Sequence, residues 1–343
     1  MTELRHGNIL DADAEALVNT VNTVGVMGKG IALQFRQAFP RNYEVYRRAC
    51  EKGEVQPGRM LIVSTDRLEN PRFIVNFPTK RHWKGKSRID DIKEGLNALV
   101  HDVRRLGIQS IAIPPLGCGN GGLEWIVVKP IIEQAMAALP GVRVLVYEPR
   151  GAPIADGMPV ATARPRMTPS RAALIGLMVN YGIPGYRLTL LEVQKLAYFL
   201  QTAGQPLRLE FVRHKYGPYA ETLNHVLQRI EGHFIRGYGD RSREASIRVI
   251  PEAVEEARTF LAGDADTFER LERVSKLIEG FETPYGMELL ATVHWIAAHE
   301  SAARAEVDKV VTLVHEWSDR KRRAFPPHHI RTVWNQLHQQ DWL

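Results

Sequence analysis

Two glycine-rich segments, each lying between a strand-like and a helix-like stretch, constrain the fold of this chain more than any other feature. The first covers residues 16–32 and reads ALVNTVNTVGVMGKGIA; the second covers residues 111–125 and reads IAIPPLGCGNGGLEW. A buried strand that ends in a glycine turn and leads into a helix is typical of layered α/β folds, whose ligands bind at the carboxyl ends of the strands. The two segments therefore predict a ligand site at one edge of a sheet.

The surrounding residues support an α/β fold. Short β-branched and apolar stretches predict strands at residues 16–18, 59–64, 72–77, 110–113 and 142–147. Between the third and fourth of these, apolar side chains recur every three or four positions from residue 89 to 106, which predicts an amphipathic helix ending at Gly107.

A proline-rich segment separates this pattern from a mostly helical remainder. Prolines are mixed there with glycine and alanine, and no apolar periodicity is visible. Beyond it helical periodicity dominates, with short strands expected at residues 208–213 and 247–250. We therefore expect an α/β domain at residues 1–150, a linker at 151–169 and a mostly helical domain at 170–343.

Charge and cysteine content restrict the setting. The net charge of +6 belongs entirely to residues 1–167, which contain 23 Lys and Arg against 17 Asp and Glu. A basic domain suits a polyanion such as nucleic acid, although a solvated basic surface explains the excess equally well. With two cysteines, no apolar run that spans a bilayer and no signal-like N-terminus, a cytoplasmic protein without a membrane segment is expected.

Each glycine segment has the features of an anion site. Glycines allow backbone N–H groups to approach a ligand, and a helix N-terminus favours negative charge. Neither segment is a Walker A loop or a dinucleotide-binding fingerprint, because the required Lys-Ser/Thr pair and ribose-binding acidic residue are missing. Two such loops at one sheet edge would hold a diphosphate from both sides. The twelve histidines show no metal-ligand spacing, so no metal or other cofactor is expected.

Gly7-Asn8-Ile9-Leu10 and the two glycine segments, in this order, resemble the macrodomain family. The resemblance implies a three-layer α/β/α fold with a mixed sheet that binds ADP-ribose. It places Asn8 and Ile9 at the adenine, although the family usually has Asp where this chain has Asn8. The other contacts that it implies are Asn19, Gly28, Lys29 and Gly30, the last three at the distal ribose, and Gly117, Cys118, Gly119, Asn120, Gly121, Gly122 and Leu123 at the diphosphate.

Over essentially its whole length the chain also resembles the DarG antitoxins of DarT/DarG toxin–antitoxin systems. DarT toxins attach ADP-ribose to thymidine in single-stranded DNA, and DarG antitoxins remove it. Residues 195–201 and 215–219 are similar to Panacea-type antitoxin domains. The resemblance implies a DNA ADP-ribosyl glycohydrolase whose second domain binds DarT, with ADP-ribosylated DNA as substrate and ADP-ribose as product. A protein-directed hydrolase and a non-enzymatic ADP-ribose reader remain alternatives.

The segment FPTKRHWK at residues 77–84 contains Lys80, which matches a lysine that the related protein glycohydrolases use in catalysis. Lys80 is expected either to assist the leaving thymine as a cation or acid, or to attack the ribose through a Schiff base. The second role needs a lowered pKa, which nearby cations at residues 81–88 would provide. Asn22 is the second catalytic candidate, as the group that orients the distal ribose, against a purely local role in the turn.

One family residue is absent. The protein glycohydrolases have a catalytic Asp in the second glycine segment, where this chain has only Glu124, which is expected to lie within the helix that starts at Leu123. A lysine–aspartate mechanism therefore does not transfer directly to this chain.

Two charged stretches suggest macromolecular partners. Cations bind phosphates and aromatic rings stack on bases, so the DNA-binding candidates are Arg81, His82, Trp83 and Lys84, against the alternative of a solvated basic loop. In the second half, acidic side chains are dense at residues 252–282. An acidic helical face that mimics DNA phosphates in the basic channel of DarT is expected there, against an ordinary solvated face.

Overall fold

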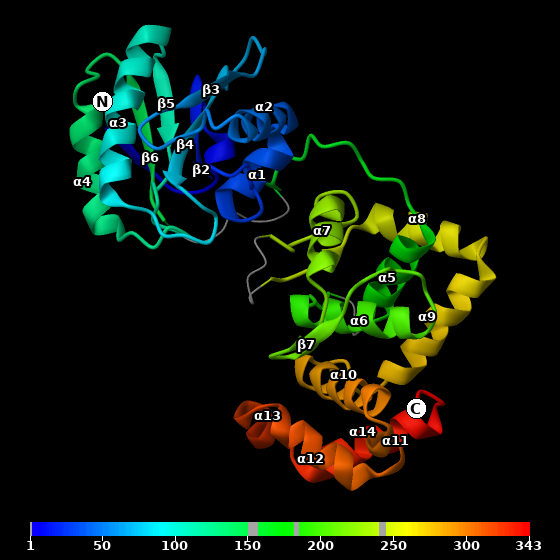
Figure 1. The fold of residues 1–343 in the computed structure, drawn as a ribbon. Helices are drawn as coiled ribbons and strands as arrows, with labels where there is room; N and C mark the ends of the chain where they lie inside the picture. The colour runs from blue at the N-terminus through cyan, green and yellow to red at the C-terminus, as the bar shows by residue number, and fades with distance from the viewer. Residues whose placement is uncertain (1, 150–156, 182–184, 240–244) are drawn as a thin grey trace. The chain divides into compact units, whose positions relative to one another are not determined.

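The computed structural model describes residues 2–149, 157–181, 185–239 and 245–343. The chain divides into two compact units, residues 1–163 and 164–343 (Figure 1). Ala161 still donates its backbone N–H to the Gln37 carbonyl of the first unit, at 2.8 Å. The end of the predicted linker at 151–169 therefore contributes to the units themselves, and residues 151–156 lie outside the described residues.

A six-stranded mixed sheet forms the middle of the first unit. The strands are β1 (Thr2–Arg5), β2 (Ala16–Asn22), β3 (Leu61–Ser64), β4 (Phe73–Lys80), β5 (Ser110–Ile113) and β6 (Arg143–Tyr147). Their order is β1-β6-β5-β2-β4-β3, and β3 alone runs antiparallel to its neighbour. The parallel strands β2 and β4 pair in a register that places Asn22 opposite Lys80, so both catalytic candidates lie at the carboxyl edge of the sheet.

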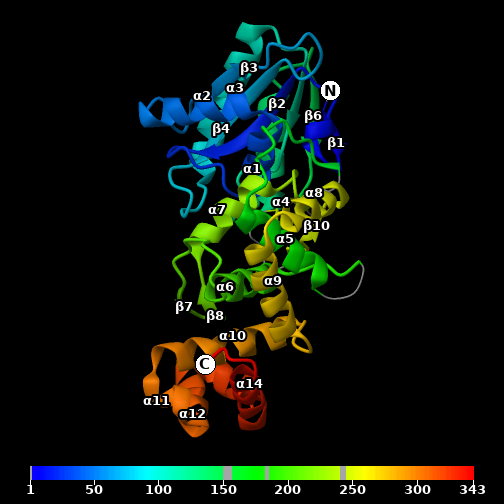
Figure 2. The same cartoon turned by 90° about the vertical axis from the view of Figure 1, so that its right-hand side faces the viewer.

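Helices cover both faces of this sheet (Figures 1 and 2). They are the short 3-10 helix η1 (Ile9–Asp11), α1 (Gly30–Ala38), α2 (Pro40–Glu51), α3 (Ile89–Leu106) and α4 (Trp125–Met136). Successive side chains of a strand point to opposite faces. Accordingly, Ala16 and Val18 of β2 share a buried cluster with side chains of α3 and α4, whereas Leu17 packs with Phe35 of α1. The expected three-layer α/β/α arrangement with a mixed sheet is confirmed.

Two strands are longer than their apolar pattern predicted. β2 continues to Asn22 and β4 to Lys80, because the backbone of the polar residues at the carboxyl edge still pairs in the ladder. The helix expected at residues 89–106 is α3, and Gly107 ends it in the left-handed conformation at φ 66°. α4 starts at Trp125, two residues later than predicted, so Glu124 precedes the helix rather than lying within it.

The second unit is mostly helical, as predicted. Its helices are α5 (Pro169–Asn180), α6 (Leu190–Thr202), α7 (Glu221–Ile230), α8 (Pro251–Ala262), α9 (Ala265–Ile278), α10 (Pro284–His299), α11 (Ser301–Ala305), α12 (Val307–Trp317), α13 (Asp319–Ala324) and α14 (Pro327–Gln339). Its short strands are β7 (Val212–His214), β8 (Gly217–Tyr219), β9 (Ile235–Arg236) and β10 (Arg248–Val249). No helix of the described ranges is long and apolar enough to cross a bilayer.

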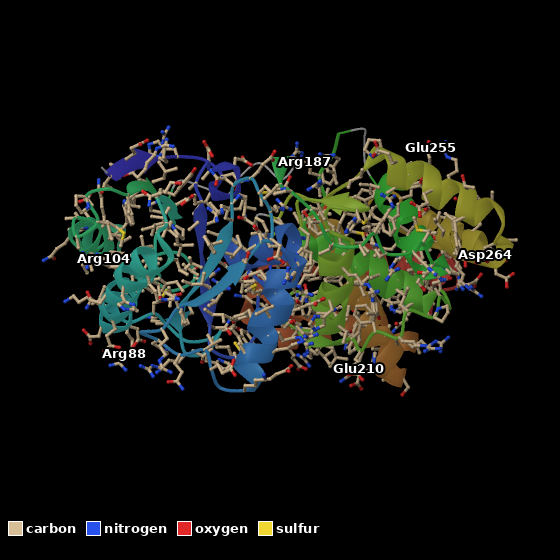
Figure 3. All side chains as sticks on the ribbon, turned by 90° about the horizontal axis from the view of Figure 1, so that it is seen from above. Arg88, Arg104, Arg187, Glu210, Glu255 and Asp264 are labelled. Carbon is tan, nitrogen blue, oxygen red and sulfur yellow. The ribbon has the colours of Figure 1, made fainter. Side chains whose placement is uncertain are left out.

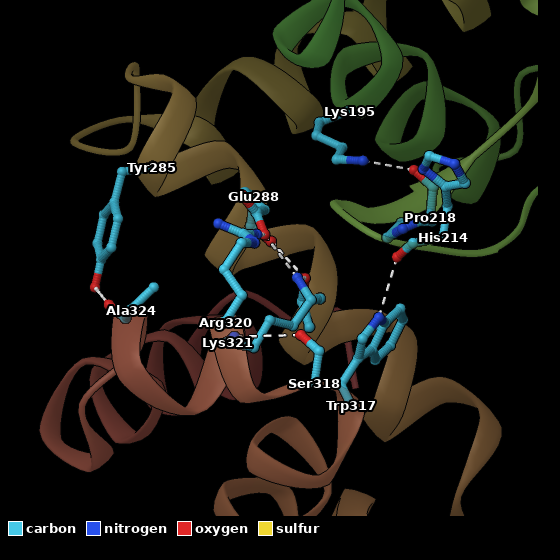
Figure 4. A network of polar contacts seen from close by, with 11 residues as sticks. Lys195, His214, Pro218, Tyr285, Glu288, Trp317, Ser318, Arg320, Lys321 and Ala324 are labelled. Atoms are coloured by element: carbon cyan, nitrogen blue, oxygen red, sulfur yellow. Dashed lines mark hydrogen bonds and ion pairs between the residues drawn. The ribbon is translucent and has the colours of Figure 1, made fainter.

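The segments that resemble Panacea-type domains form one packing unit. Gln194 of α6 donates to and accepts from the backbone of Ala220, both at 3.0 Å. The buried Lys195 amine donates to the Pro218 carbonyl at 2.6 Å (Figure 4). Burial lowers the pKa of Lys195 to about 7. These residues attach the β7–β8 hairpin to α6. In this chain, the residues that resemble Panacea-type domains therefore have a structural role.

A second buried lysine joins α13 to α10. Lys321 has no exposed surface, and its amine donates to Glu288 at 2.7 Å and to Thr292 at 2.9 Å. Arg320 pairs with the same Glu288 carboxylate (Figure 4). Because a buried charge requires a partner, this network fixes α13 on the core of the second unit.

Candidate active site

Three loops meet at the carboxyl edge of the sheet. We call them the first glycine loop (residues 23–29), the basic loop (81–88) and the second glycine loop (114–124). Thr23 donates its hydroxyl to the Arg81 carbonyl at 2.5 Å, which joins the first glycine loop to the basic loop. The Lys80 amine donates to the Asn120 carbonyl, and the Ser87 N–H to the Gly121 carbonyl at 3.0 Å. The basic loop is thus attached to the second glycine loop at both of its ends.

The backbone of the second glycine loop is shaped to receive an anion. Leu123 donates its N–H to the Gly117 carbonyl at 3.0 Å, which closes the loop on itself. A Cβ atom on Gly121 would lie 2.2 Å from that same carbonyl oxygen, so only glycine fits there. Nothing in the described ranges accepts a hydrogen bond from the N–H groups of Gly119, Asn120 and Gly121. Consecutive free N–H groups in such a turn are a typical phosphate-binding arrangement.

The side chain of Asn22 shapes the first glycine loop. Its Oδ1 accepts from the N–H groups of Val24 at 3.0 Å and Val26 at 3.3 Å, and its Nδ2 donates to the Val26 carbonyl at 2.5 Å. The buried Tyr46 of α2 donates its hydroxyl to the Asn22 carbonyl at 2.7 Å. This is the local turn role that the sequence left open, so orientation of the distal ribose by Asn22 stays a prediction.

The two glycine loops approach each other closely. Gly30, the first residue of α1, has a φ of 54°, and a Cβ atom there would lie 3.2 Å from Asn120 Nδ2. The distal-ribose candidates Gly28 and Lys29 are in the same turn, directly before α1. The structure therefore brings together most residues that were predicted to hold the ribose and the diphosphate.

Lys80 lies between these loops with a lowered pKa. Burial is the main cause, and the positive charge of Lys29 is the second. We expected cations at residues 81–88 to lower the pKa of Lys80. This expectation is wrong, because the lowering comes from burial and from Lys29. Arg81 instead pairs at 2.9 Å with Asp91, whose side chain is buried at the start of α3. A partly buried lysine with a lowered pKa is suited to proton transfer or nucleophilic attack.

The basic loop presents cations and two stacked rings to solvent. The rings of His82 and Trp83 stack with centroids 5.4 Å apart, and the Lys84 amine lies 4.9 Å from the Trp83 ring centroid. Trp83 is 47% exposed. Arg88, at the end of this loop, extends from the periphery of the first unit (Figure 3). The loop therefore has the features of a nucleic-acid contact, and that assignment remains a prediction.

Three of the predicted ligand contacts serve the local fold in this structure. Asn8 caps η1 by accepting the Leu10 N–H at 3.1 Å, and Ile9 is buried in the core. Asn19 has no exposed surface, and its Nδ2 donates to Asn76 at 3.0 Å. Contacts of these side chains with adenine or ribose stay predictions.

Sequence reasoning missed the residues that hold the loops in place. Tyr46 lies on α2 and Ser87 just before α3, and neither belongs to a motif. Ser87 fits between Gly117 and Gly121, where a Cβ on Gly121 would meet its hydroxyl at 2.3 Å. Helical periodicity marks Tyr46 only as a core position, because its bond to Asn22 depends on tertiary packing.

The remaining groups of the edge do not add a second catalytic centre. Burial raises the pKa of the Cys118 thiol to about 11, so this sulfur is uncharged and a poor nucleophile near neutral pH. Glu124 is exposed at the start of α4. In the described part of the chain, no three His, Cys, Asp or Glu side chains are grouped to hold a metal ion.

Comparison with known proteins agrees with this geometry. The Macro domain family model matches residues 18–132. The DNA ADP-ribosyl glycohydrolase of Thermus aquaticus is 51% identical over 338 residues, which cover 98% of this chain and 93% of the relative. The DNA ADP-ribosyl transferase–DNA ADP-ribosyl glycohydrolase fusion protein of Thermosipho africanus is 36% identical over 151 residues, 40% of this chain and 39% of the relative. The solved macrodomain of Thermus aquaticus DarG, at 56% identity, covers 43% of this chain and 100% of that structure with a TM-score of 0.42.

The fold and the loops at its sheet edge define the class of the first unit, which is a macrodomain. With more than half of its residues identical to a relative over nearly its full length, the chain belongs to the family of DNA ADP-ribosyl glycohydrolases, the DarG family.

Proposed function

We propose that this enzyme removes ADP-ribose from thymidine in single-stranded DNA by hydrolysing the N-glycosidic bond, and that its second unit binds the DarT toxin. The observation that carries the first part is Lys80, which lies between two glycine loops with its pKa lowered. In a reader, glycine loops alone are sufficient to hold ADP-ribose, whereas a lysine prepared for proton transfer is needed only for turnover.

The second glycine loop is the best site for the diphosphate, because the N–H groups of Gly119, Asn120 and Gly121 have no acceptor in the described structure. The turn at Gly28, Lys29 and Gly30 then surrounds the distal ribose, which brings the anomeric carbon toward Lys80. Ile9 packs with side chains of β6 and α1, and Asn8 precedes it as the cap of η1; we assign the adenine end of the ligand to these two residues.

Cleavage of the N-glycosidic bond places positive charge on the ribose and negative charge on the departing thymine. As an acid, Lys80 transfers a proton from Nζ to the thymine, and the neutral amine then takes up the proton that water loses as it adds to the anomeric carbon. As a nucleophile, its neutral amine displaces the thymine, and the ring-opened imine is hydrolysed by water to release ADP-ribose and the free lysine. Lys80→Arg keeps the positive charge but supplies neither a transferable proton nor a nucleophile, so activity retained in this variant indicates a purely electrostatic role.

The decisive test is incubation with an oligonucleotide that contains ADP-ribosylated thymidine, scored by release of ADP-ribose. Lys80→Ala is expected to abolish turnover while ADP-ribose binding, measured by calorimetry, persists. Lys93→Ala on the exposed face of α3 is the matched control. Full activity of Lys80→Ala refutes the assignment. If the wild-type protein releases ADP-ribose from modified protein but not from DNA, the protein-directed alternative is supported. If it binds ADP-ribose but releases none, it is a reader.

The proposal for toxin binding rests on an acidic and apolar face formed by α5, α8 and α9. These helices surround a hollow of about 470 Å³ with mostly apolar walls. On α9, Ala265, Phe268 and Leu271 line the hollow. One position further along the helix, Asp266, Glu269 and Glu272 form a parallel exposed acidic stripe. The combination suits a partner surface that is basic with apolar anchors.

The acidic groups of this face differ in their availability. Glu255, which extends from α8 (Figure 3), pairs with Arg258 at 3.1 Å, and Glu256 pairs with Arg164 at 2.6 Å. Within the described ranges, the stripe on α9 has no ion-pair partner. Charge reversal of Asp266, Glu269 and Glu272 is therefore expected to weaken toxin binding and its salt dependence, whereas Glu255→Lys, in a pair that is already neutralised, is expected to have a smaller effect. Unchanged affinity of the triple variant dismisses this face.

A further inference from the structure

Exposed large apolar side chains of the first unit gather around the candidate site. Seven are exposed among its described residues, and two of them, Leu4 and Leu68, lie elsewhere. The other five, which we call the apolar rim, are Val24, Val26, Trp83, Ile126 and Val127, with exposures from 40% to 79%. Isolated exposed apolar residues are ordinary on protein surfaces, but a concentration around one ligand site indicates contact with an apolar partner surface.

Two loops of the site and the helix that follows the third contribute to this rim. Val24 and Val26 belong to the first glycine loop, where both backbone N–H groups are held by Asn22. The bond from Thr23 to the Arg81 carbonyl places that loop beside the basic loop, which carries Trp83. Ile126 and Val127 form the first turn of α4, directly after the second glycine loop. The rim is therefore held by the same contacts that assemble the site.

The charge of these loops selects the partner. The first glycine loop, the basic loop and the second glycine loop together contain five cations (Lys29, Arg81, Lys84, Lys86 and Arg88) and one carboxylate (Glu124). A surface that combines cations with exposed apolar and aromatic side chains matches single-stranded DNA, in which phosphates alternate with apolar base faces.

We propose that the apolar rim holds the bases that flank the modified thymidine, so that the enzyme recognises a segment of DNA strand rather than the ADP-ribosylated nucleoside alone. The inference rests on the proposed function and extends it, because the roles proposed above for the glycine-loop backbone and Lys80 concern only the ADP-ribosyl group and its leaving base. Flanking bases displace water from the exposed valine, isoleucine and tryptophan side chains, and the neighbouring cations neutralise their phosphates.

The test compares two substrates, a single-stranded oligonucleotide with one ADP-ribosylated thymidine and the ADP-ribosylated nucleoside. For the full-length protein, the ratio of their kcat/KM values is expected to favour the oligonucleotide. The double variants Val24→Ser/Val26→Ser and Ile126→Ser/Val127→Ser are each expected to lower this ratio by about tenfold, the size of the lost burial of an aliphatic side chain. Leu68→Ser is the matched control. Leu68 is fully exposed and lies before the start of β4, whereas Lys80 is at the end of that strand.

The ratio separates the possible results. A fall in both substrates by the same factor shows that these side chains serve the ADP-ribose site, and an unchanged ratio shows that they do not contact DNA; either result overturns the inference. Loss of toxin binding with an unchanged ratio assigns the rim to a protein interface and also overturns it. If the wild-type protein releases no ADP-ribose from the oligonucleotide, the proposed function itself fails.

Discussion

The two glycine loops resemble each other in sequence, but different interactions hold them. The first takes its shape from side chains: the amide of Asn22 closes the turn and Tyr46 of α2 secures it. The second is closed by its own backbone, with Ser87 filling the space between Gly117 and Gly121. Glycine spacing thus indicates where a chain approaches a ligand, whereas the groups that fix the loop follow from tertiary structure. The difference also predicts which substitutions each loop tolerates.

The largest effect is expected in the second glycine loop from Gly121→Ala. The added Cβ would lie 2.2 Å from the Gly117 carbonyl oxygen and 2.3 Å from the Ser87 hydroxyl, so the backbone must move. A displacement of about 1 Å at a substrate-positioning group costs on the order of 100-fold in turnover. We therefore expect kcat/KM on the modified oligonucleotide to fall about 100-fold.

Gly119→Ala is the matched control for this substitution. It lies in the same loop, its φ is not in the left-handed region, and a Cβ there meets nothing within 4 Å. Equal losses in both variants contradict the assigned role of the Gly117–Gly121 contact.

A smaller effect is expected in the first glycine loop from Tyr46→Phe. The variant keeps the buried ring and removes the hydroxyl that donates to Asn22, which leaves a buried carbonyl with one partner fewer. A lost hydrogen bond of this kind costs about 1 kcal/mol, which corresponds to roughly fivefold weaker ADP-ribose binding if the turn loosens. Calorimetry with ADP-ribose measures the change.

Tyr43→Phe on the same helix serves as its control, since the Tyr43 ring faces Arg36 and no described hydrogen bond joins its hydroxyl to the loop. If Tyr46→Phe lowers the melting temperature without any change in ADP-ribose affinity, Tyr46 stabilises the fold but does not position the loop.

The smallest effect, a shift in pH dependence, is expected from Lys29→Met. Removing this cation favours the protonated form of Lys80, so the pKa of Lys80 rises toward its ordinary value. If the reaction needs the neutral amine, activity then appears only at higher pH. If the reaction needs the ammonium, activity extends to higher pH before it declines. The pH profile of kcat records the direction, and Lys93→Met is the control. An unmoved profile excludes an effect of Lys29 on the catalytic step.

Much of the first unit follows from its sequence, and the exceptions have physical reasons. The apolar periodicity of residues 89–106 predicts both ends of α3 correctly, because one face of this helix packs on the sheet. The ends of β2 and β4 were missed because Asn22 and Lys80 are polar residues that still belong to the ladder. The charge that acts on Lys80 was assigned to its sequence neighbours, whereas Lys29 reaches it from another loop.

In the second unit, local patterns were less informative. Apolar residues recur at helical spacing through residues 303–318, but the structure divides this stretch at Glu306 into α11 and α12. Five of the six residues of α13 are charged, so no apolar periodicity in the sequence predicts this helix. It is held by the buried contacts of Lys321 with Glu288 and Thr292, which no periodicity in the sequence reveals.

The attachment of the basic loop at both ends has a consequence for how this enzyme can diversify. Lys80 and Ser87 fasten the flanks of the loop to carbonyls of the second glycine loop, and the residues at 81–86 between them are exposed. Because Arg81 also pairs with the buried Asp91, sequence changes confined to residues 82–86 leave the contacts that anchor the loop intact. This outer part of the loop can therefore vary in sequence, and with it the surface beside the candidate site, while the two glycine loops keep their positions.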